Sequence, residues 1–141
     1  MEGGVSSKIL EISRPSSLHL FDVDFSLCEP AVLEHPSVQL HQGLSRERLV
    51  QCESNSFDWI YIDGDHSYEG VMTDIEAAAP LLKPGGLLVF NDYAHLTPNG
   101  FGSFSVHRAV TRFVCSHRWR FVYFAWQRNG LYDVAIKAPE V

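Results

Sequence analysis

Hydrophobic residues follow two spacings along most of this chain. Continuous apolar runs at residues 18–23, 57–62 and 87–90, with a shorter one at 38–41, predict buried β-strands. Helical spacing over residues 6–12, 68–82 and 106–115 predicts helices between them, and shorter helices are expected at 30–35 and 47–52. The chain therefore reads as alternating strands and helices.

The end of the chain has a different pattern. Residues 119–126 and 131–137 alternate as strands around Asn129-Gly130, a pair that favours tight hairpins. Together the elements predict an α/β fold: a Rossmann-like, mostly parallel sheet with helices on both faces and a C-terminal antiparallel hairpin. Because 141 residues with 45% hydrophobic content suffice for one core, residues 1–141 are expected to form a single domain.

Composition narrows the possible partners and location. A net charge of −6 argues against a nucleic-acid surface, and Arg118 and Arg120 alternate with apolar residues, as on the exposed face of a strand. No apolar run reaches the roughly 20 residues of a membrane span, and the N-terminus has no signal-peptide pattern. Three widely spaced cysteines (Cys28, Cys52 and Cys115) suggest neither disulfides nor a zinc site, so we expect a cytoplasmic protein.

Polar residues follow the predicted strands. Asp22 closes the run at 18–23, Asp63 follows 57–62, and Asn91-Asp92 follow 87–90. In a parallel sheet, ligands bind at the carboxyl ends of the strands. These residues are therefore the first candidates for a binding site.

Residues 57–93 carry a specific resemblance. They contain an apolar strand ending in Asp63-Gly64-Asp65-His66, a helix, a Leu-Lys-Pro-Gly-Gly segment, and a second strand ending in Asn91-Asp92. This stretch resembles the core of class I S-adenosylmethionine-dependent methyltransferases, especially the small-molecule O-methyltransferase branch that includes cephalosporin-hydroxylase-like proteins. The final hairpin resembles the strand pair that separates this family from nicotinamide enzymes.

The resemblance implies a set of cofactor-binding residues. Gly3 and Gly4 resemble the end of the glycine-rich loop that approaches S-adenosylmethionine, although an ordinary helix-entry turn explains them equally well. Asp22 matches the acid that accepts hydrogen bonds from the ribose hydroxyls. Asp24 is the alternative if the strand ends two residues later, and a plain turn acid is the competing interpretation. Asp63 also falls near the cofactor.

The resemblance also implies a reaction site. Asp63, Asn91 and Asp92 occupy the metal-ligand positions of metal-dependent relatives, and their oxygen donors suit Mg²⁺ rather than zinc. Their acid/amide order is reversed from that of the catechol-type enzymes. His66 occupies the position of the group that deprotonates the acceptor. Alternatively, His66 only lines the loop while Asp65 or Ser67 caps the next helix.

The chain departs from the resemblance at its start, where only Met1 and Glu2 precede Gly3, so we expect the first strand of the family's fold to be missing. We expect compensation, either by direct pairing of the strands at 18–23 and 57–62 or by a strand from another chain in a homodimer. The predicted function is methylation of a small-molecule oxygen with divalent-metal assistance. The alternative is a truncated, non-catalytic binding or assembly module. A nicotinamide oxidoreductase is disfavoured because no G-x-G-x-x-G motif is present.

Overall fold

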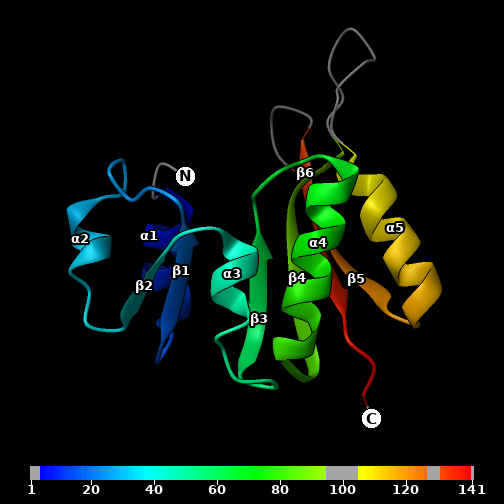
Figure 1. Ribbon diagram of the computed structural model, residues 1–141, viewed down its shortest axis with the longest axis horizontal. Coiled ribbons are helices and arrows are strands. Elements are labelled where there is room, and N and C mark those ends of the chain that lie inside the picture. The colour runs from blue at the N-terminus through cyan, green and yellow to red at the C-terminus, as the bar shows by residue number, and fades with distance from the viewer. Residues whose placement is uncertain (1–3, 95–104, 127–130, 141) are drawn as a thin grey trace, which may run out of the picture. The chain divides into compact units, whose positions relative to one another are not determined.

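The computed structural model describes residues 4–94, 105–126 and 131–140 and has an α/β fold (Figure 1). Its residues form two compact units, Met1–Gln51 and Cys52–Val141. The predicted fold class, with parallel strand–helix units and a C-terminal antiparallel hairpin, is confirmed. That residues 1–141 form a single domain stays a prediction.

The first unit is built on a small parallel sheet. β1 (Leu18–Asp22) pairs along its whole length with β2 (Val38–Gln42). Three helices belong to this unit: α1 (Gly4–Ser13) contacts α2 (Pro30–Leu33), and α3 (Ser45–Leu49) contacts β1. Val32 and Leu49 are its buried apolar residues in the described part of the chain.

Gly43 makes the turn that follows β2. Its N–H donates to the Asp22 carbonyl at 2.9 Å, so the parallel pairing reaches the end of β1. Its φ of +136° lies outside the range favoured by other residues, and a Cβ there would come within 2.8 Å of Arg48 Nε. A glycine is therefore required beside Asp22.

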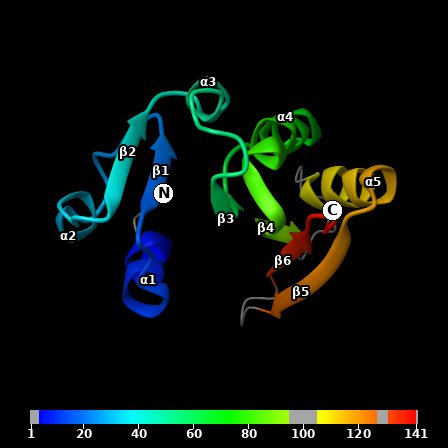
Figure 2. The ribbon, with the colours of Figure 1, turned by 90° about the horizontal axis from the view of Figure 1, so that it is seen from below.

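The second unit holds a four-stranded sheet in the order β3-β4-β6-β5. Its strands are β3 (Phe57–Ile62), β4 (Leu82–Ala94), β5 (Arg120–Trp126) and β6 (Tyr132–Lys137). β3 and β4 are parallel, and the β4–β6 and β6–β5 pairs are antiparallel. α4 (Tyr68–Ala78) and α5 (Val106–His117) contact each other and lie on one face of this sheet (Figure 2).

The core of this second unit lies between the two helices and the sheet. The strands contribute alternate residues and the helices contribute residues three or four apart, as expected for one apolar face on each element. Fully or almost fully buried members are Val71, Ile75, Leu88, Phe90, Ala109, Val110, Val134 and Ile136.

Two helices end three or more residues before their predicted ends. The helix predicted over residues 68–82 ends at Ala78, a 3₁₀ turn (Ala79–Leu81) follows, and β4 begins at Leu82. Pro80 is the cause, because it has no N–H to donate to the preceding helical turn. The short helix predicted at 47–52 lies earlier, at Ser45–Leu49.

Direct pairing between the strands at 18–23 and 57–62, which lie in different units, stays a prediction. Within the units, β1 pairs with β2 and β3 pairs with β4. Each of these pairs joins strands consecutive in sequence through one short crossover, which is the connection parallel strands favour. A strand supplied by a second copy of the chain stays a prediction.

The remaining sequence features are the predicted turn, possible membrane-spanning helices and the cysteines. The predicted turn at residues 127–130 lies outside the described ranges. No helix in the described part is long and apolar enough to span a membrane. Cys28, Cys52 and Cys115 form no disulfide in the described structure.

Candidate functional site

Asp63 and Asn91 meet at the carboxyl ends of two neighbouring strands. β3 and β4 are parallel and Ile62 pairs with Phe90, so the residues that follow lie side by side. Asn91 Nδ2 donates to Asp63 Oδ1 at 2.8 Å. The structure thus brings together two site residues taken from separate strand ends.

Asp92 lies in an irregularity of β4. Phe90 pairs with Val134 and Ala94 pairs with Tyr132, so three residues of β4 (91–93) stand opposite one residue of β6, Asp133. These extra residues form a bulge, in which the backbone leaves the regular ladder. Asp92 has φ +49° there, and its N–H donates to Asp133 Oδ1 at 3.1 Å.

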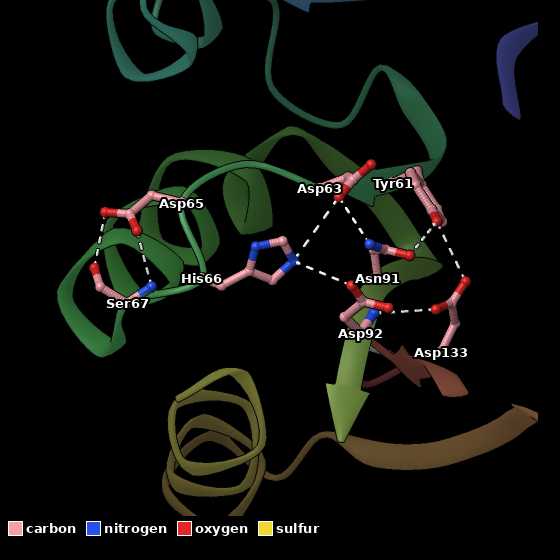
Figure 3. A network of polar contacts seen from close by, with 8 residues as sticks. All are labelled: Tyr61, Asp63, Asp65, His66, Ser67, Asn91, Asp92 and Asp133. Carbon is pink, nitrogen blue, oxygen red and sulfur yellow. Dashed lines mark hydrogen bonds and ion pairs between the residues drawn. The ribbon is translucent and has the colours of Figure 1, made fainter. Parts of the chain in front are cut away.

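His66 points between two carboxylates (Figure 3). Its Nε2 lies 3.8 Å from Asp63 Oδ1 and 4.0 Å from Asp92 Oδ2, and all three side chains are about one-fifth exposed. The His66 carbonyl accepts the N–H of Ser105, the residue before α5, at 2.9 Å. Nε2 itself is buried, so the structure holds this ring nitrogen against two acidic side chains at the carboxyl ends of β3 and β4.

The neighbouring residues Asp65 and Ser67 form the helix cap expected from the sequence. Ser67 Oγ accepts the Gly70 N–H at 3.1 Å, and Asp65 accepts the Ser67 N–H and hydroxyl at 2.9 and 2.8 Å. These bonds lower the pKa of the Asp65 carboxyl. In Figure 3 this pair lies apart from the His66 ring, so capping and the His66 arrangement coexist.

Burial dominates the electrostatics of Asp63. It raises the pKa of the Asp63 carboxyl above its ordinary value, although the Asn91 hydrogen bond and His66 favour the ionised form. Asp92 adds to the upward shift by like-charge repulsion. Asp63 is therefore less acidic than an exposed aspartate.

Tyr61 and Asp133 were not predicted as site residues. The Tyr61 hydroxyl lies 3.1 Å from Asn91 Oδ1 and 3.2 Å from Asp133 Oδ2. Burial, followed by the negative charges of Asp133 and Asp63, raises the pKa of Tyr61, so the phenol stays protonated and donates. The sequence signal for Asp133 was slight: a single acid within an otherwise apolar alternating strand.

The predicted magnesium ligands are together but do not offer three oxygens to one ion. Asp63 Oδ1 faces the Asn91 amide nitrogen, and Asn91 Oδ1 faces the Tyr61 hydroxyl. Metal binding would require the Asn91 amide to turn over. In the described ranges, no group of three His, Cys, Asp or Glu side chains is arranged to hold a metal. Magnesium binding therefore stays a prediction. The side chains of Asp63, Asn91 and Asp92, as they lie in the described structure, do not fit a magnesium ion.

The predicted cofactor residues of the first unit are placed only in part. Gly3 lies outside the described residues, and Gly4 is the first residue of α1, with nothing within 4 Å of a Cβ position. Asp22 is half-buried at the end of β1, and its Oδ1 accepts the Asp24 N–H at 3.2 Å. A carboxylate at a strand end has the acceptor chemistry that a ribose diol needs.

Comparison with known families decides the assignment of the chain. The sequence profile of the methyltransferase domain family matches residues 7–93, more than half of the chain. The chain belongs to the methyltransferase domain family. No curated protein sequence matches this methyltransferase domain.

Solved structures share the fold of this methyltransferase domain. A protein from Corynebacterium glutamicum is 15% identical with a TM-score of 0.74, covering 97% of this chain and 68% of its own. A spermidine synthase from Thermotoga maritima is 17% identical (TM-score 0.68; 99% and 52% covered). A SAM-dependent methyltransferase from Methanosarcina mazei is 13% identical (TM-score 0.67; 99% and 89% covered). The chain thus spans about half the length of the spermidine synthase.

Proposed function

We propose that this chain is an S-adenosylmethionine-dependent methyltransferase that methylates a small-molecule oxygen. The observation that carries the proposal is His66, whose Nε2 lies within 4.0 Å of two carboxylates at the carboxyl ends of parallel strands. Membership of the methyltransferase domain family supports the reaction class. When bound, S-adenosylmethionine supplies a methyl group on a sulfonium, which is activated toward displacement.

His66 would remove the acceptor proton. As the acceptor oxygen forms a bond to the methyl carbon and the carbon–sulfur bond breaks, the hydroxyl proton passes to the imidazole ring of His66. Asp63 and Asp92 then stabilise the imidazolium, because both lie within 4.0 Å of Nε2, which is itself buried. No step in this scheme needs a metal.

Cofactor binding is the first test. Calorimetric titration of the whole chain with S-adenosylhomocysteine is expected to show binding. Asp22→Ala should weaken it by roughly 10- to 100-fold, because a carboxylate that accepts hydroxyl hydrogen bonds would be lost. Asp24→Ala is the matched control, since Asp24 is exposed and holds only Ser26 through its carboxylate in the described structure. A larger loss in Asp24→Ala would assign the ribose to Asp24 instead.

Methyl transfer is the second test. S-adenosylmethionine with a labelled methyl group is incubated with phenols, catechols, sugars and carboxylic acids. His66→Ala should lower transfer by about 10²–10⁴-fold if His66 is the general base. Added Mg²⁺ and a chelator test the magnesium prediction in the same assay. Binding of S-adenosylhomocysteine without transfer to any acceptor would favour the non-catalytic binding module.

A further inference from the structure

Asp133 holds two groups of the site from the opposite strand. Its Oδ1 accepts the Asp92 N–H at 3.1 Å, and its Oδ2 lies 3.2 Å from the Tyr61 hydroxyl. Figure 3 shows Asp133 on the far side of Asp92 from His66. Asp133 therefore contacts Asp92 through the backbone while the Asp92 side chain faces His66.

The backbone of Asp92 needs such support. A φ of +49° lies in the left-handed region, which costs most residues of order 1 kcal/mol or more and which aspartate adopts more readily than most. The bulge in β4 also takes the Asp92 N–H out of the regular ladder, and a part-buried N–H needs an acceptor. A carboxylate is a strong acceptor for it, because hydrogen bonds to ionised groups are the stronger ones.

We propose that Asp133 is a positioning residue. By accepting the Asp92 N–H, it holds Asp92 in the left-handed conformation that places Oδ2 4.0 Å from His66 Nε2. The inference rests on the proposed function, which gives the Asp92–His66 pair its purpose. Asp133 itself lies behind this pair and acts through Asp92.

The experiment separates the hydrogen bond from the bulk of the side chain. Asp133→Asn keeps an acceptor oxygen for the Asp92 N–H, whereas Asp133→Ala and Asp133→Val remove it. Valine keeps the strand preference of the position and serves if the alanine variant does not fold. Asp58→Ala, which removes an exposed carboxylate of β3 that pairs with Lys83, is the control.

NMR of the whole chain measures the backbone conformation and hydrogen bonding of Asp92, and it needs no substrate. In the alanine and valine variants the Asp92 amide should exchange with solvent roughly 10-fold faster or more, whereas in Asp133→Asn it should stay within about threefold of wild type. The coupling between the Asp92 amide and α protons, which reports φ, should change in the first two variants only. Unchanged exchange and coupling in alanine and valine, or equal changes in asparagine, would overturn the proposal.

The methyl-transfer assay measures how the Asp133 variants change the reaction rate. Asp133→Val is expected to lower kcat about 10-fold with little change in KM for S-adenosylmethionine, and Asp133→Asn to restore most of the rate. An equal loss in both variants would overturn the positioning role. Absence of transfer by the wild-type chain would instead overturn the proposed function, while the NMR result would still decide the geometry.

Discussion

Asn91 shows how single atoms decide what the site can do. Its amide nitrogen donates to Asp63 and its amide oxygen faces the Tyr61 hydroxyl, so both ends of the side chain are engaged. The reversed acid/amide order places the amide in register with Asp63 and leaves the acid, Asp92, for the bulge. The order therefore gives His66 two carboxylates as neighbours.

Tyr61→Phe tests this network at the residue scale. Removing the hydroxyl leaves Asn91 Oδ1 and Asp133 Oδ2 without its hydrogen, so the free energy of unfolding should fall by about 1 kcal/mol. Urea unfolding measures the loss. Tyr123→Phe is the matched control, because the Tyr123 side chain is 63% exposed on β5, and it should change stability little. Equal effects in the two variants would show that the network does not stabilise the fold.

At the scale of elements, the β1–β2 pair holds two histidines in contact, His19 and His41, here called the histidine couple. His19 Nδ1 and His41 Nε2 lie 3.1 Å apart, and the His41 ring stacks on Phe21 with centroids 4.5 Å apart. Burial and then His41 lower the pKa of His19, while burial and then Arg48 lower the pKa of His41. Both rings therefore favour the neutral form in the folded unit.

Acidification should weaken this element. Because both folded-state pKa values lie below the unfolded value of about 6.5, the unfolded chain binds more protons below that pH. The stabilising contribution is complete above about pH 6.5 and is lost as the pH falls through the folded-state values. The urea midpoint should therefore drop between about pH 7.5 and about pH 5.5.

Variants isolate this couple from other titrating groups. The double variant His19→Gln/His41→Gln should show a smaller drop in urea midpoint than wild type over the same pH range. His35→Gln, in the exposed segment before β2, should keep the wild-type drop. The same pH dependence in all three proteins would mean that the couple does not carry it.

At the scale of the whole molecule, the question is whether the two compact units unfold cooperatively, in a single transition. The predicted single domain requires Met1–Gln51 and Cys52–Val141 to unfold together. All three tryptophans lie in the second unit, whereas His19, His35 and His41 lie in the first. Tryptophan fluorescence and the NMR signals of these three histidines therefore report the two units separately, whereas the other four histidines lie in the second unit.

We expect the two probes to give coincident urea transitions. A single core that spans the chain would make unfolding all-or-none, so the tryptophan and histidine signals should share one midpoint. Light scattering at the same protein concentrations tests a separate prediction, that the folded chain forms a homodimer. Two separate midpoints would show that the chain consists of two independently unfolding domains.

The sequence alone determined most elements and one part of the site. Periodicity is local, so it located β3 with its observed bounds and most of the other elements within a few residues. It also predicted that Asp63 and Asn91 would meet, because strands joined by one crossover helix lie side by side and in parallel. The helix predicted over residues 68–82 is too long, because the apolar spacing continues past Pro80, where the helix ends in a 3₁₀ turn.

Only the tertiary structure decided the rest of the site. The bulge in β4 depends on how β6 pairs with it, and no pattern within either strand shows that register. Asp133 reaches the Asp92 N–H from 41 positions away and the Tyr61 hydroxyl from 72 positions away. Contacts over such separations depend on strand order and register, which is why periodicity located the strands but missed the residue that supports the site.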